Sequence, residues 1–109
     1  MIKLILLDID GTLTSKRGKI PEKNYKALKK AQEQGHKIFI NTGRSRGNIS
    51  DDLFAALSFA DGMVCGNGCH IIIEGRDVFK QFIPVNVLTK LIDYVIARPN
   101  IWCVFEGEK

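Results

Sequence analysis

The sequence contains little cysteine and no long apolar run. Its 109 residues include three cysteines, Cys65, Cys69 and Cys103. An odd and small number of cysteines argues against a disulfide framework and favours a reducing compartment. Cys65 and Cys69 lack a second pair of ligands, so a zinc site is not expected. No apolar stretch is long enough to span a bilayer, and no signal peptide precedes the first apolar segment. We therefore expect a cytoplasmic protein with no membrane partner.

The sequence also lacks the pattern of a nucleic-acid-binding protein. The formal net charge is +4, but the lysines and arginines are spread along the chain and are not interleaved with aromatic residues. Hydrophobic residues make up 45% and charged residues 26%, as in an ordinary soluble protein. The length suits one small domain. We expect no nucleic-acid partner.

Strands and helices are predicted to alternate in the first 65 residues. An apolar run, Ile2–Leu7, is typical of a strand that is buried on both faces. Pro21 opens a helix that Gly35 ends, and Asp61-Gly62 precedes a third strand. The remaining predicted elements are the strands Lys37–Asn41 and Met63–Cys65, and a helix that carries Ile49, Leu53, Ala56 and Leu57 on one face. This βαβαβ order predicts half of a doubly wound parallel sheet.

The pattern changes after residue 66. Asn67-Gly68 indicates either a hairpin turn or the crossing into a second unit. The predicted elements that follow are the strands Cys69–Ile73 and Val78–Ile83, a helix that begins at Pro84, and a last strand Ile101–Phe105. We therefore predict an α/β unit over residues 1–66 and the beginning of an α+β unit over residues 67–109.

Polar residues stand at the ends of the first two predicted strands. Asp8 and Asp10 follow the first strand, and Thr42, Gly43 and Arg44 follow the second. The carboxyl ends of adjacent parallel strands meet at one edge of a sheet, where ligands bind in open α/β folds. We expect the two motifs to converge there.

This set of groups suits phosphoryl transfer. Alternate residues of a strand point to opposite faces, so the chain has to turn directly after Asp8, and Gly11 makes such a turn easy. One carboxylate can attack phosphorus, and a second acid can protonate the leaving oxygen and then activate water. Thr42 and the N–H groups near Gly11 and Gly43 can bind phosphate oxygens. Mg²⁺ is expected as the cofactor that holds an anionic phosphate beside the carboxylates.

Three segments resemble a known family. Leu6–Leu13 (LLDIDGTL), Ile38–Arg44 (IFINTGR) and Asn67-Gly68 are similar to the start of haloacid dehalogenase (HAD) superfamily phosphatases, more narrowly of the Cof-type (IIB) branch with an α+β cap. The resemblance implies an incomplete doubly wound, Rossmann-like core sheet followed by the start of the cap. It also implies a Mg²⁺-dependent enzyme that hydrolyses small phosphorylated metabolites, such as sugar phosphates, through an aspartyl-phosphate.

The resemblance assigns roles to three of the candidate residues. Asp8 is implied to be the nucleophile and Asp10 the general acid and base. The Asp8 carboxylate and the Asp10 backbone carbonyl are implied to ligate Mg²⁺, and Thr42 to bind the transferring phosphate. Arg44 either contacts the substrate or caps the turn that follows it.

The family pattern also includes a later lysine and a Gly-Asp-x-x-x-Asp-type acidic loop, and this sequence contains no such loop. We therefore expect a truncated chain that is nearly inactive alone, and an open apolar edge at the first strand that favours self-association. Two alternatives stay open at this point. One is a phosphomutase of the same superfamily, and the other is a non-catalytic phosphate-binding or interaction module.

Overall fold

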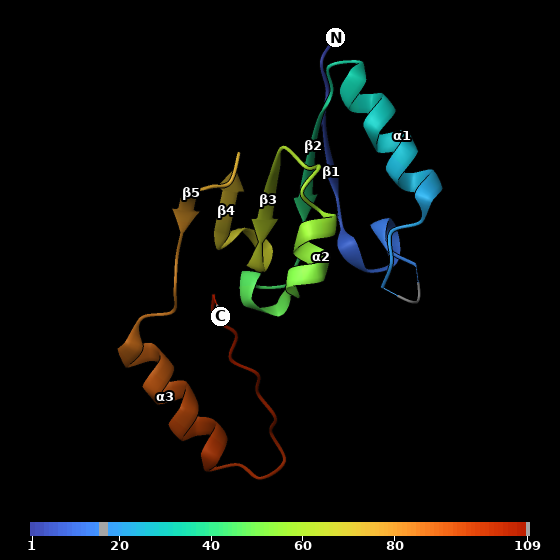
Figure 1. Cartoon of the computed structure of the whole chain (residues 1–109). Helices are drawn as coiled ribbons and strands as arrows, with labels where there is room; N and C mark the ends of the chain where they lie inside the picture. The colour runs from blue at the N-terminus through green and yellow to red at the C-terminus, as the bar shows by residue number, and fades with distance from the viewer. Residues whose placement is uncertain (16–17, 109) are drawn as a thin grey trace.

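The computed structural model describes residues 1–15 and 18–108, and these residues form one five-stranded sheet with three α-helices (Figure 1). The strands are β1 (Leu4–Leu7), β2 (Lys37–Asn41), β3 (Gly62–Cys65), β4 (His70–Ile73) and β5 (Arg76–Lys80). The α-helices are α1 (Glu22–Glu33), α2 (Asp51–Ala56) and α3 (Val85–Ile96). The spatial order of the strands equals their order in the chain. None of the described helices is both long enough and apolar enough to cross a bilayer.

The parallel half of the sheet confirms the predicted βαβαβ unit. β1 pairs with β2 and β2 pairs with β3, both in parallel. Helix α1 starts after Pro21, with Glu22 in its first turn bonded to Lys26 at 2.7 Å. It stops just before Gly35, whose φ of +85° is the left-handed conformation that ends many helices.

A small core lies around β2, β3 and the turn after β1. It consists of the buried side chains Ile9, Leu13, Ile40, Ile49, Leu57, Met63, Cys65 and Ile72. Gly62 fits here because it has no side chain: a Cβ on Gly62 would lie 2.7 Å from Phe39 Cζ, closer still to Phe39 Cε1, and 2.8 Å from the Ile72 carbonyl oxygen. The core therefore fixes the spacing between β2 and β4 across β3.

β1 lies at the edge of the sheet and pairs only with β2. Leu4 and Leu6 are 57% and 51% exposed, so the prediction that this strand is buried on both faces is wrong for the described chain. An apolar edge is open instead.

The second half of the sheet is an antiparallel hairpin. β4 pairs with β3 and β5 pairs with β4, both antiparallel. The two residues of the turn, Glu74 and Gly75, have φ values of +50° and +74°, which is the geometry of a tight hairpin. β5 therefore begins at Arg76 and ends at Lys80, earlier than the predicted Val78–Ile83. The predicted division into units 1–66 and 67–109 falls at the change from parallel to antiparallel pairing, and it stays a prediction.

Helix α3 follows Pro84 as predicted, but it has no buried residue and lies apart from the sheet (Figure 1). The predicted last strand, Ile101–Phe105, is wrong, since residues 101–108 have no regular secondary structure. A strand needs a partner for its backbone hydrogen bonds, and the described chain supplies none to this segment. Trp102 in the segment is 94% exposed.

Candidate functional site

The turn after β1 bends as the two carboxylates require. An Asp8 carboxylate oxygen accepts from the Ile9 N–H at 2.8 Å, and the backbone N–H of Leu13 donates to the Asp8 carbonyl at 3.1 Å. Gly11, with φ +77°, allows the reversal inside this turn. Ile9 is fully buried while Asp8 and Asp10 are exposed. The buried isoleucine thus anchors the turn, and both acidic side chains stay accessible to solvent.

An ion pair joins the two predicted motifs. Arg44 donates from Nε to Asp10 Oδ2 at 2.8 Å and from Nη2 to Asp10 Oδ1 at 2.7 Å. This two-point geometry is the strong form of a guanidinium–carboxylate pair. The Arg44 hydrogen bonds hold the pKa of Asp10 below its usual value. The predicted convergence of the Asp-x-Asp and Thr-Gly-Arg motifs is therefore present in the structure, with Asp10 in its ionised form.

Thr42 is the buried anchor of the second motif. It is 3% exposed, its N–H donates to the Val64 carbonyl at 2.9 Å, and its hydroxyl oxygen accepts from the Arg44 N–H at 3.1 Å. These bonds fix the loop after β2 against β3. Gly43 follows directly and is exposed, and it precedes Arg44, the partner of Asp10.

Asn67 is a site residue that the sequence interpretation missed. Its N–H donates to the Thr42 carbonyl at 3.2 Å, and its side-chain oxygen would lie 3.3 Å from a Cβ on Gly43. Its φ of +54° turns the chain after β3 back toward the second motif. The sequence signal was the position of Asn67 after the third strand, where Asn67-Gly68 was interpreted as a hairpin or crossing signal and as part of the family resemblance, but not as part of the site.

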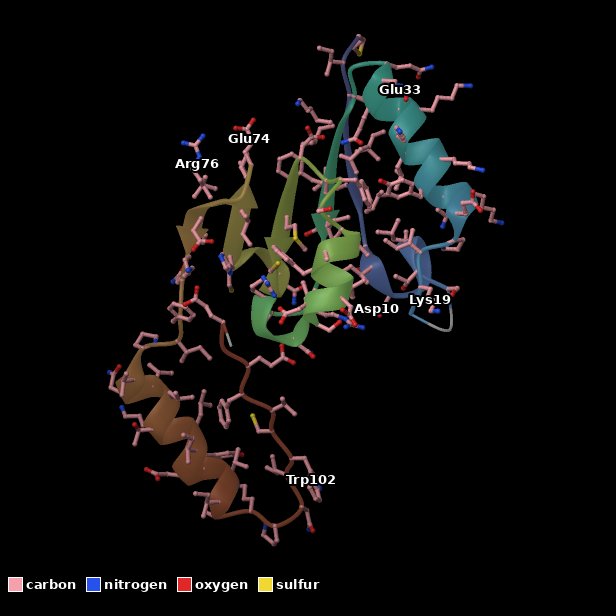
Figure 2. The ribbon with its side chains drawn as sticks, in the orientation of Figure 1. Asp10, Lys19, Glu33, Glu74, Arg76 and Trp102 are labelled. Carbon is pink, nitrogen blue, oxygen red and sulfur yellow. The ribbon has the colours of Figure 1, made fainter. Side chains whose placement is uncertain are left out.

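We call the resulting edge the rim: the turn Asp8–Leu13, the loop Thr42–Ser45 and the turn Gly66–Gly68. Figure 2 shows Asp10 at this end of the sheet, with Glu74 and Arg76 at the other end. Gly11 belongs to the rim as a turn residue, and in the described structure it makes no hydrogen bond to the loop Thr42–Ser45. The rim thus offers two carboxylates, an arginine, a hydroxyl and exposed backbone N–H groups.

The oxygen atoms of the rim fit a hard divalent cation. Both carboxylate oxygens of Asp10 accept hydrogen bonds from Arg44, which leaves the Asp8 carboxylate and backbone carbonyls of the turn, the Asp10 carbonyl among them, as oxygen ligands for a cation. Both are the kind of ligand that Mg²⁺ prefers. Elsewhere in the described residues, His70, Asp77 and Glu108 also bring ligand atoms together. The Lys80 ammonium already bonds both carboxylates of that second group.

Comparisons with a family model and with curated proteins identify hydrolases and phosphatases that are similar to this chain. The family model that matches this sequence describes a haloacid dehalogenase-like hydrolase and matches residues 5–109. Phosphatase YwpJ of Bacillus subtilis is 31% identical over 107 residues, which are 97% of this chain and 37% of YwpJ. The chain spans about a third of the length of the curated relatives that it matches.

Two solved structures share the fold. BT1666 from Bacteroides thetaiotaomicron, described among phosphatases of the haloalkanoate (HAD) superfamily, matches with a TM-score of 0.75 and 33% identity over 89% of this chain and 36% of its own. The HAD subclass IIB sugar phosphatase BT4131 matches with a TM-score of 0.73 and 28% identity over 90% of this chain and 38% of its own.

Proposed function

The chain belongs to the haloacid dehalogenase-like hydrolases, and from this membership we propose that its rim is the nucleophile-bearing part of a phosphatase for small phosphorylated metabolites. The observation that carries the proposal is the two-point Arg44–Asp10 ion pair, because it joins the two motifs at the carboxyl ends of β1 and β2. The phosphatase names of YwpJ and BT4131 support the same class of reaction.

The proposed reaction has two steps. In the first, an Asp8 carboxylate oxygen attacks the phosphorus, the bond from phosphorus to the leaving oxygen breaks, and Asp10 gives a proton to that oxygen. In the second, Asp10 takes a proton from water, the water oxygen attacks the phosphorus of the aspartyl-phosphate, and Asp8 is released with inorganic phosphate. Because Arg44 keeps Asp10 ionised, Arg44 has to leave Asp10 for the incoming phosphate before Asp10 can carry a proton.

Binding of the phosphate is assigned to the second motif. The Thr42 hydroxyl and the exposed N–H of Gly43 can donate to phosphate oxygens, together with the Arg44 guanidinium and the N–H of Gly11. We propose Mg²⁺ as the cofactor, held by the Asp8 carboxylate and the Asp10 carbonyl. When bound, it supplies positive charge between the phosphate and Asp8.

The isolated chain is expected to turn over very slowly. One carboxylate and one carbonyl make a weak Mg²⁺ site, and Lys80 is held by Asp77 and Glu108, so it does not neutralise a phosphate at the rim. Loss of one electrostatic group commonly costs about 10² to 10³ in rate. Hydrolysis of p-nitrophenyl phosphate by the 109-residue chain checks this. A rate equal to that of intact family members would contradict it.

A covalent-labelling experiment tests the proposed chemistry. The chain is incubated with acetyl phosphate and Mg²⁺, digested, and analysed by mass spectrometry. We expect the peptide that contains Asp8 to gain one phosphoryl group, which hydroxylamine removes, and we expect Asp8→Asn to stay unlabelled. Asp52→Asn, at an exposed carboxylate of α2, serves as the matched control and should be labelled like the natural sequence. Equal labelling of Asp8→Asn would show that Asp8 is not the nucleophile.

We also propose where the protein is located and what it binds. The described cysteines, Cys65, Cys69 and Cys103, are free thiols, which supports a cytoplasmic protein in a reducing environment. The partner that we propose is a small phosphate monoester, with a second copy of the chain at the β1 edge. The binding-module alternative predicts that inorganic phosphate shifts the Gly43 amide resonance while no phosphoryl group becomes attached to Asp8.

A further inference from the structure

A pocket of about 490 Å³ starts at the rim. Gly43 and Asn67 line the end beside the phosphate-binding loop, and Lys80, Glu106 and Glu108 line the other side. The volume lies in the range of small-molecule sites. A phosphate monoester held at Thr42 and Gly43 would extend its leaving group into this pocket, because the pocket begins at Gly43.

The last described residues, 104–108, form one wall of the pocket, and we call them the strap. After α3 the chain turns back, so that its end lies near the ends of β3 and β4 (Figure 1). The Gly47 N–H donates to the Gly107 carbonyl at 3.2 Å, and Glu108 pairs with Lys80. A Cβ on Gly47 would lie 2.9 Å from the Glu108 carbonyl carbon. Gly47 therefore permits the strap to pack against the loop after β2.

Glu106 fixes the strap at the position nearest to Arg44. One of its carboxylate oxygens accepts from the Asn48 Nδ2 at 2.7 Å, and the other accepts from the Ser45 N–H at 3.2 Å. Each oxygen keeps a lone pair for a further donor. The Glu106 carboxylate is thus held in place beside the rim by two neutral donors.

The other charged side chains that line the pocket in the described chain have ionic partners. Lys80 bonds Asp77 and Glu108, and His70 lies 2.7 Å from Asp77. The Arg46 guanidinium lies over the Phe54 ring at 3.7 Å and 4.0 Å from Asp51. Outside the pocket lining, Arg44 is occupied by Asp10. One ammonium faces two carboxylates in the group Lys80, Asp77 and Glu108, and Glu106 adds a further carboxylate that is bound by neutral donors. A leaving group in the pocket therefore meets excess negative charge, to which Glu106 contributes.

We infer that Glu106 is a specificity-determining residue: it favours phosphate monoesters whose leaving group is a neutral polyol and disfavours those that carry a second anionic group. The inference rests on the proposed function. Hydroxyl groups can donate to the free lone pairs of Glu106, whereas a second carboxylate or phosphate in the pocket is repelled by it.

The experiment compares two ligands of nearly equal size, glycerol 3-phosphate and 3-phosphoglycerate, which differ by a hydroxymethyl group and a carboxylate. Their dissociation constants are measured on the full chain with Mg²⁺, from the amide resonances of Gly43 and Asn67. We expect the natural chain to prefer glycerol 3-phosphate by about threefold or more, as suits a partly exposed charge. Glu106→Gln should markedly reduce this preference.

Two further variants control the result. Glu74→Gln removes a carboxylate at the opposite end of the sheet (Figure 2), and it should keep the preference. Glu106→Asp keeps the charge on a shorter side chain and should also keep it. If Glu106→Asp loses the preference as fully as Glu106→Gln, strap contact rather than charge is responsible, and the inference is overturned.

Inorganic phosphate separates this inference from the proposed function. If it leaves the Thr42 and Gly43 amides unshifted in every protein, the proposed function fails and the inference fails with it. If it shifts them but the ligand preference is the same in Glu106→Gln as in the natural chain, only the inference fails. A preference of the natural chain for 3-phosphoglycerate would likewise overturn the inference alone.

Discussion

The Asp61 carboxylate accepts several hydrogen bonds at the end of the sheet opposite the rim. It accepts from the Ile38 N–H and the Lys37 ammonium, each at 2.9 Å, and from the Gln32 amide at 3.2 Å. Its side chain is 22% exposed. Burial alone raises the pKa of Asp61, but the hydrogen bonds from Ile38, Lys37 and Gln32 outweigh it and hold the pKa below the usual value.

Asp61→Asn is expected to lower the free energy of unfolding by about 1–3 kcal/mol at pH 7, because one acceptor oxygen is lost from partly buried donors. The folded pKa of Asp61 is depressed, so its contribution is present above the unfolded pKa and is lost as the pH falls through the folded pKa. The acid destabilisation below about pH 4 should therefore be shallower in the variant. Urea unfolding followed by circular dichroism measures both effects.

Asp93→Asn is the control for this prediction, since Asp93 is an exposed carboxylate on α3. Its effect should stay within about 0.5 kcal/mol. An Asp61→Asn chain as stable as this control at every pH would show that the hydrogen bonds of Asp61 contribute little.

β1 is one of the two edge strands of the sheet. In the described part of the chain its outer backbone edge has no partner strand, and Leu4 and Leu6 are more than half exposed. Open apolar edges pair with other chains, and natural proteins often protect them with lysine. We expect the chain to self-associate through β1 and Leu6→Lys to reduce the mass measured by light scattering toward 12.2 kDa.

Leu91→Lys on α3 is the matched control, because it also replaces an exposed leucine, which is 41% exposed, with a charge. It should leave the association unchanged. A natural chain that is already a stable monomer at low concentration would rule out this role for β1.

The sequence predicted those helices and strands that are marked by residues within the element or directly beside it. Pro21 and Gly35 bound α1, Pro84 precedes α3, and the apolar run ending at Asn41 is β2. The predicted strand Ile101–Phe105 failed because a strand exists only where another strand accepts its hydrogen bonds, and no sequence pattern reports that partner.

The candidate site likewise contains one contact that the sequence predicted and others that it did not. The convergence of Asp10 with Arg44 followed from the rule for parallel strands, and the structure contains it. The contact of Asn67 with Gly43 and the contact of Glu106 with Ser45 depend on how distant segments pack. These partners are 24 and 61 positions apart in the chain and share no motif, so no sequence pattern indicates their contacts.

The whole molecule is less compact than its length suggests. Its radius of gyration is 16.7 Å, against about 13 Å for a compact domain of this size. Helix α3 contributes to the difference, because it lies away from the sheet and most of its apolar residues are exposed, including Ile96 at 77%. A helix of 12 residues is marginal in water without packing partners.

Hydrogen exchange of the full chain should therefore give two levels of protection. The amides of β2 and β3, which lie in the core, are expected to exchange only through global unfolding, whereas the amides of α3 should exchange far faster through local opening. Mass spectrometry of peptic fragments measures this difference. Equal protection of α3 and β2 would mean that the helix is packed against another surface in solution.

The identity between strand order in space and strand order in the chain has a consequence for biosynthesis. On the ribosome, each strand after β1 emerges beside a partner that has already been made, so no segment has to wait for a distant one. The residues of the rim are all present once position 68 has left the exit tunnel. We expect the nascent chain to assemble the loops of the rim before α3 has been translated.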